Sequence, residues 1–295
     1  MPKSNIPVTA LSWAGSNCLR NMALLALLIL LAPMNDGWAA DSERSWQTPK
    51  MTLLDRPEFI NKTVQLLNGG IPGTGKEYDA QKISDDLVAM IYGELQDSSG
   101  IHAETALATL GALAGFAGQM AIRETLVKPG KMREDEAFKV VKAKNGETYY
   151  TGDLLNEILF APRPGNFSID GQVTEAARQA GAKELPDAKD IASDVARVVG
   201  TGAFGVPRVP PEHMPKKSPI QLLDKFWNPV RNYLVVSVSS PPQWPLVIGL
   251  AAQKVIIKAK DAIDPGVAAK LVMEAAIAMA EVDPAKVHFA YFQSY

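Results

Sequence analysis

One segment, residues 102–126, limits what this chain can fold into. Apart from a run near the N-terminus it is the most apolar part of the sequence, and between Ala106 and Ile122 only Thr109 and Gln119 are notably polar. A helix that is apolar on every side has to be surrounded by other elements. The sequence therefore predicts a buried central helix, which the rest of the chain must cover.

The same segment contains Gly111, Gly115 and Gly118 among alanines. Small residues allow neighbouring helix backbones to approach closely, and a Gly-x-x-x-Gly pair is also a packing motif of membrane helices. The apolar run is short for a bilayer, and Glu104 and Arg123 bracket it closely. We therefore interpret it as a core helix, and we predict no stable membrane span in the mature chain.

Helical periodicity and capping signals mark the elements around this segment. Ile83, Leu87 and Ile91 follow one another at a four-residue spacing, which gives an amphipathic helix its apolar face. Later helices begin where a capping residue precedes proline, because the side-chain oxygen satisfies free N–H groups and proline fits the first turn. The predicted helices are 55–68, 83–95, 102–126, 154–160, 187–199, 219–236, 243–262, 265–281 and 284–292, with a loop over 161–171.

Two short strands interrupt this helical pattern. Phe138 to Lys144 and Glu147 to Thr151 are rich in residues that favour strands, and Asn145-Gly146 between them suits a type I′ turn. The predicted fold class is therefore all-α, a multi-helix globular domain with one small inserted β-hairpin at about 138–151.

The N-terminal region has the features of a secretion signal. Met22 to Met34 is an uncharged apolar run, Arg20 precedes it, and small residues at Gly37 and Ala39 suit cleavage after Ala39. We predict a signal peptide over 1–39, and hence a periplasmic or secreted protein. Translation from Met51 is the alternative, and it would give a cytoplasmic protein.

The predicted domain organisation follows from these features. Residues 40–54 are expected to form a flexible tether, and residues 55–295 a single helical domain. Gly and Pro are concentrated over 200–218, which makes this segment the candidate for an internal linker.

Composition excludes several classes of function. The formal net charge of −2 and pI near 6.0 give no basic excess for nucleic acid, so we predict no nucleic-acid partner. The single cysteine, Cys18, lies in the leader, so the mature chain would have no disulfide, no cysteine nucleophile and no thiolate metal site.

Two glycine-rich motifs resemble nucleotide loops but lack the required context. Gly70 to Glu77 nearly matches a phosphate-binding loop, yet Glu77 replaces the hydroxyl that would bind Mg²⁺. Gly200 to Gly205 matches G-x-G-x-x-G, yet a predicted helix precedes it where a dinucleotide site needs a strand. We interpret both as connectors and predict no cofactor.

Four polar residues beside the central helix and the hairpin are the catalytic candidates: His102, Glu104, Asp153 and Glu157. His102 and Glu104 form an H-x-E pair, but the downstream cysteines of a zinc deaminase are missing. Within a helix, residues two apart point to different faces, so this pair is not expected to converge on one ion. His213 and His288 give no ligand spacing either, and we predict no metal site.

Two further groups of residues have both a functional and a structural interpretation. Arg163, Arg208, Lys216 and Lys217 lie in predicted loops and would suit an anion, although a solvated surface explains them equally. Aromatic residues towards the C-terminus would line either a pocket or partner surface, or the core: Phe226, Trp227, Tyr233, Trp244, Phe289, Tyr291, Phe292 and Tyr295.

The leading hypothesis is an exported, non-enzymatic helical protein that binds an envelope protein or a small ligand. It follows from elimination, since no nucleophile–base pair, metal cluster or nucleotide loop survives. The second hypothesis is an enzyme whose acid/base site is assembled from distant helices. The third is a cytoplasmic helical protein that begins at Met51.

Overall fold

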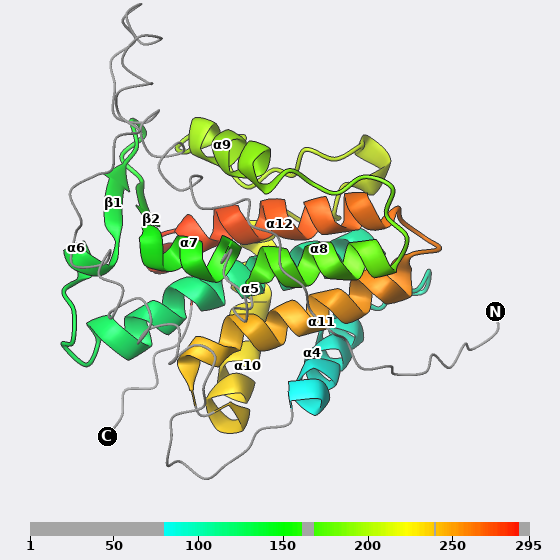
Figure 1. Cartoon of the computed structure of the whole chain (residues 1–295), viewed down its shortest axis with the longest axis horizontal. Coiled ribbons are helices and arrows are strands. Elements are labelled where there is room, and N and C mark those ends of the chain that lie inside the picture. Colours follow the sequence, from blue (N-terminus) through cyan, green and yellow to red (C-terminus); the bar gives the residue numbers. More distant parts are fainter. Residues whose placement is uncertain (1–79, 161–167, 239, 289–295) are drawn as a thin grey trace, which may run out of the picture.

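The computed structural model of the protein describes residues 80–160, 168–238 and 240–288, which form a mostly helical fold with one two-stranded hairpin. Helix α5 (Ala103–Ile122) runs through the middle of the molecule (Figure 1) and continues into a π-helical turn, η2 (Arg123–Val127). Every residue from 104 to 122 is buried. The predicted central helix is therefore confirmed, and so is the all-α class with its inserted hairpin.

Five helices make the main contacts with α5: α4 (Ala80–Leu95), α7 (Asp153–Phe160), α10 (Pro219–Ser237), α11 (Trp244–Ala259) and α12 (Pro265–Glu281). Helix α8 (Ile169–Gln179) packs on α11 and α12, and α9 (Ala188–Val198) packs on α12. Short elements complete the described part: α6 (Glu134–Ala137), η3 (Pro211–His213), η4 (Pro241–Gln243) and η5 (Pro284–Lys286). One nearly continuous apolar core lies around α5.

Helices α5 and α12 approach each other closely in this core. A Cβ atom built on Gly111 would lie 2.3 Å from the Val272 carbonyl oxygen, and one on Gly115 would lie 1.9 Å from that of Ala276. The two backbones therefore touch where the glycines have no side chain. By length and apolarity 103–127 would suffice to cross a membrane, but an 18-residue apolar window within it is wholly buried by the protein itself.

The predicted proline-associated starts are confirmed for three elements. Asp264 accepts hydrogen bonds from the N–H groups of Gly266 and Val267 at the start of α12, and Ser218 forms a capping box at the start of α10. Asp283 caps only a 3₁₀ turn, because the backbone is already extended at Val287. The predicted helix over 284–292 is therefore wrong up to residue 288.

Helix α8 corrects the predicted loop over 161–171. The Ser168 side chain accepts a hydrogen bond from the Gly171 N–H, so the helix already begins at Ile169. This helix contains Gly171 and many polar residues, and its apolar face is narrow. Tertiary contact with α11 fixes it: Gln172 donates to the Leu246 carbonyl at 3.1 Å, and Gln253 donates to the Gln172 carbonyl at 2.7 Å.

The predicted hairpin is confirmed, with a different turn. Strands β1 (Lys139–Lys142) and β2 (Thr148–Thr151) pair in antiparallel register. A type I′ turn would need positive φ at Asn145, but among the described residues only glycines have positive φ, here Gly146 at 85°. The Ala143 N–H donates to the Glu147 carbonyl, so the loop 144–146 has one residue more than a type I′ hairpin loop. The Gly146 N–H donates to the Ala143 carbonyl at 3.0 Å, and the left-handed conformation of Gly146 accommodates the additional residue.

The segment 206–218, which we call the strap, leads into α10 from the turns that follow α9, and ion pairs hold it against the helices. The Arg208 guanidinium lies 2.8 Å from Asp190, 3.0 Å from Asp194 and 3.2 Å from Glu274, and its backbone N–H also donates to Glu274. Glu274 is only 5% exposed. Burial raises the pKa of the Glu274 carboxyl, although the Arg208 N–H and guanidinium oppose this shift.

Several predictions concern residues outside the described ranges. These are the signal peptide over 1–39, the tether over 40–54, the helix over 55–68, and the glycine-rich motif over 70–77. Arg163 and the last aromatic residues, from Phe289 onwards, also lie outside those ranges.

Candidate functional site

The end of the strap meets the start of α5. His102 is the N-cap of this helix, and its Nδ1 accepts a hydrogen bond from the Thr105 backbone N–H at 3.3 Å. The Thr105 Oγ1 lies 2.9 Å from the same nitrogen and accepts a hydrogen bond from the Lys216 N–H at 2.9 Å. Because Nδ1 is the acceptor here, a neutral His102 carries its proton on Nε2.

Glu104 lies between two histidines. Its Oε1 is 2.9 Å from Nδ1 of His213, and its Oε2 is 3.5 Å from Nδ1 of His102. Only 11% of the Glu104 side chain is exposed. Because its carboxylate accepts from Nδ1 of His213, it orients this ring and leaves Nε2 as a proton acceptor. His102 comes closer to Glu104 than the helical spacing predicts, because it lies outside the helix in extended backbone.

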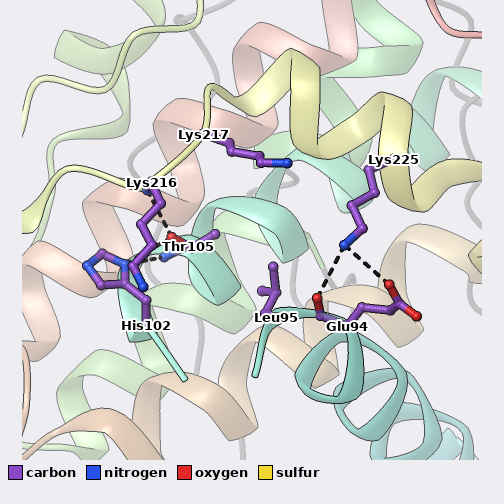
Figure 2. A pocket seen from close by; sticks show the side chains of 7 residues that line it. All are labelled: Glu94, Leu95, His102, Thr105, Lys216, Lys217 and Lys225. Atoms are coloured by element: carbon purple, nitrogen blue, oxygen red, sulfur yellow. Dashed lines mark hydrogen bonds and ion pairs between the residues drawn. The ribbon is translucent and has the colours of Figure 1, made fainter. Parts of the chain in front are cut away.

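A pocket of about 190 Å³ opens beside this cluster (Figure 2). It lies between the last residues of α4, the start of α5, the end of the strap and α10. Seven residues line it: Glu94, Leu95, His102, Thr105, Lys216, Lys217 and Lys225. The pocket therefore joins segments that are more than a hundred residues apart in sequence.

Two of the three lysines in the pocket are engaged by protein groups. Lys225 Nζ lies 3.2 Å from the Glu94 carboxylate and donates to the Glu94 carbonyl, also at 3.2 Å, which satisfies a free carbonyl at the end of α4. Lys216 Nζ lies 2.8 Å from Asp97, and with the Ser99 hydroxyl and N–H it holds the pKa of that carboxyl well below its usual range.

Lys217 differs from its two neighbours. Within the described residues it has no ion-pair or hydrogen-bond partner, and its side chain is exposed on the strap. In Figure 2 its ammonium group extends over the pocket towards Lys225. Among the described residues that line the pocket, Lys217 is therefore the lysine without a protein partner.

The four sequence candidates fall into two places. His102 and Glu104 lie together at the start of α5, whereas Asp153 and Glu157 lie on α7. This helix packs on the far half of α5, where a Cβ on Gly118 would lie 3.1 Å from the Ile158 side chain. Gly118 is about 20 Å along the helix axis from Glu104. The structure therefore does not assemble the four candidates into one site.

The remaining histidine and the aromatic residues lie elsewhere. His288 pairs with Asp224 at 3.1 Å and is largely exposed. Phe226, Trp227 and Trp244 belong to the buried core, and Tyr233 is half-buried beside it. Over the described part of the chain, no group of three or more His, Cys, Asp or Glu residues is arranged to hold a metal ion.

Comparison with known proteins identifies no relative of this chain. No protein-family model, no curated protein and no solved structure matches the chain.

Sequence reasoning found only part of this site. It singled out His102 and Glu104 as a pair, and Lys216 and Lys217 as loop residues that would suit an anion. Glu94 and Lys225 gave no signal, because each is an ordinary charged residue on an amphipathic helix. The contact between Glu104 and His213 spans 109 residues, and no spacing rule predicts it.

Proposed function

We propose that this protein binds a small ligand in the pocket between α4, α5, the strap and α10, without catalysing a reaction. The observation that supports this most directly is Lys217, which lies over the pocket while Lys216 and Lys225 are paired with carboxylates. Pockets assembled from several elements are a common form of small-molecule site.

The size of the pocket favours a small molecule over a protein segment. A volume of about 190 Å³ is modest, and an engineered cavity of about 150 Å³ in another protein is enough to hold benzene. Leu95 and the aliphatic stems of the lysines supply the apolar wall, while the ammonium groups remain in water.

The proposed location of binding is the periplasm or the extracellular space, which rests on the leader over 1–39. Cell fractionation followed by intact mass measurement tests this part. A periplasmic species that begins at Ala40 or Asp41 is expected. A cytoplasmic species that begins at Met51 would contradict export and leave the pocket proposal unchanged.

A small-molecule screen by saturation-transfer NMR tests the binding proposal. Leu95→Trp fills the pocket, whereas Leu185→Trp places the same side chain at an exposed position outside it. We expect compounds that bind the wild type and Leu185→Trp but not Leu95→Trp. Compounds that bind all three proteins equally would show that the pocket is not the binding site.

One observation favours a second candidate, an acid/base enzyme. The Glu104 carboxylate orients His213 and leaves its Nε2 available, which is the arrangement of a carboxylate-supported general base. Compounds identified in the screen should be incubated with the protein and followed by NMR. Turnover that is lost in His213→Gln and retained in His288→Gln would replace the binding proposal with this one.

A further inference from the structure

We infer that the ligand of this pocket is a small organic anion and that Lys217 is the residue that pairs with its charge. The inference rests on the proposed function, because it names the chemical class of the ligand for the same pocket. It depends on which charges around the pocket are already compensated.

The compensated charges come in two pairs. Lys216 is held by Asp97, and Lys225 is held by both the carboxylate and the backbone carbonyl of Glu94. A ligand that competed for either lysine would have to displace an existing partner. Lys217 requires no displacement, so an incoming carboxylate or comparable anion meets it first.

The remaining negative charge near the pocket is directed elsewhere. Glu104 does not line the pocket, and its carboxylate contacts His213 at 2.9 Å and His102 at 3.5 Å. Since the Glu94 and Asp97 carboxylates are each matched by a lysine, Lys217 is the lining lysine without a carboxylate partner among the described residues.

The rest of the lining determines the shape of the anion. Leu95 and the methylene stems of the lysines offer apolar contact below the charged groups. A ligand with one anionic group on a compact apolar body would use both features. Inorganic anions would use only the charge of Lys217, and neutral apolar molecules would use only the apolar surface.

Benzoate and its neutral isostere benzamide test this inference directly. Each is titrated into the full-length protein, and binding is followed through NMR shifts of the Leu95 methyl groups and the His102 ring. Because a solvent-exposed ion pair contributes modestly, we expect benzoate to bind about fivefold more tightly than benzamide at low salt. The preference should shrink as salt screens the pair.

Lys217→Met should remove the preference while leaving benzamide binding unchanged. Lys183→Met is the matched control, because Lys183 is exposed and lies outside the pocket. An unchanged preference for benzoate in Lys217→Met would overturn the role of Lys217. Equal binding of the two probes to the wild type would overturn the anionic class while leaving the pocket proposal intact. Absence of binding by either probe would overturn this inference too, and the wider screen would then decide on the pocket.

Discussion

The middle of α5 and its N-terminal end are held by opposite means. In the middle, Gly111 and Gly115 allow the backbone of α12 to touch that of α5, with no polar side chain between them. At the N-terminal end, Glu104 and Thr105 hold the strap through His213 and the Lys216 N–H. One helix therefore combines a contact determined by side-chain size with a contact determined by hydrogen bonds and charge.

This difference separates stability from binding. The contact between α5 and α12 is made by closely approaching backbones, and the buried Gln119 side chain of α5 donates to the Ala280 carbonyl of α12, so this contact leaves no space for a ligand. The contact with the strap leaves a pocket and an unpaired lysine at its edge. Substitutions in the middle should therefore alter the free energy of unfolding, and substitutions at the end should mainly alter binding.

The largest expected effect on the free energy of unfolding comes from adding a methyl group in the middle of α5, where this helix contacts α12. Gly115→Ala places a Cβ where the Ala276 carbonyl oxygen would lie 1.9 Å away, so the two helices must move apart. We expect a loss of about 3 kcal/mol or more in the free energy of unfolding, measured by urea denaturation.

Gly93→Ala is the matched control, since nothing lies within 4 Å of a Cβ at that position on α4. There the same substitution should stabilise by about 0.5–1 kcal/mol, because alanine favours the helix. Equal effects at the two glycines would contradict the close contact between α5 and α12.

The second largest effect on the free energy of unfolding is expected at Arg208, whose ion pairs hold the strap against α9 and α12. Arg208→Met leaves Glu274 buried beside Lys270 alone, and we expect a loss of about 2 kcal/mol in unfolding free energy. The double variant Arg208→Met/Glu274→Met should be more stable than the single one, because it leaves no buried carboxylate unpaired. A double variant that is less stable than Arg208→Met would show that Glu274 does not depend on this guanidinium.

Asp170 is a buried carboxylate with no cationic partner among the described residues. Asp170 is 8% exposed and accepts from the Thr174 hydroxyl at 3.2 Å, and burial raises its pKa to about 6. The folded protein therefore binds this proton more tightly than the unfolded chain, whose Asp pKa is about 3.9. The stability that protonated Asp170 contributes is complete below pH 4 and is lost as the pH rises through 6.

Asp170→Asn should remove this dependence on pH. We expect the variant to be about 2 kcal/mol more stable than the wild type at pH 7.5 and equal to it near pH 4, by urea denaturation at both values. Asp261→Asn, at an exposed position, should show no such difference. A variant that is destabilised at pH 7.5 would contradict the assigned direction of the pKa shift.

The smallest expected effect on stability is at the pocket itself. Lys217 is exposed and has no partner among the described residues, so Lys217→Met should change the unfolding free energy by no more than about 0.5 kcal/mol. Thermal and urea denaturation both measure this. A larger loss would mean that Lys217 supports the fold and would weaken its assignment to a ligand.

The sequence predicted the parts of the fold that depend on local signals. The alanine- and glycine-rich run predicted α5 and its burial, and Asp264-Pro265 predicted the first residue of α12. The errors arose where tertiary contacts decide. Helix α8 depends on Gln172 and Gln253 bonding across helices, and the type I′ turn failed because one additional residue changed the loop.

The candidate site was predictable only at its local end. His102 and Glu104 are two residues apart, and their position before an apolar run already indicated a helix start. His213 and Lys216 belong to the strap, and the path of the strap is fixed by the ion pairs of Arg208 with α9 and α12. A single sequence contains no periodicity that reports such a path, so the pocket became visible only in the folded chain.

The most direct test of this account is the affinity of Thr105→Val for benzoate. Valine keeps the shape of Thr105 but removes the oxygen that accepts the Lys216 N–H, so the strap loses the attachment to α5 that lies nearest the pocket, while the His213–Glu104 contact and Lys217 are unchanged. The account predicts that benzoate binds several-fold more weakly than to the wild type, in a protein that remains folded. Wild-type affinity in this variant would contradict the claim that attachment of the strap to α5 forms the binding site.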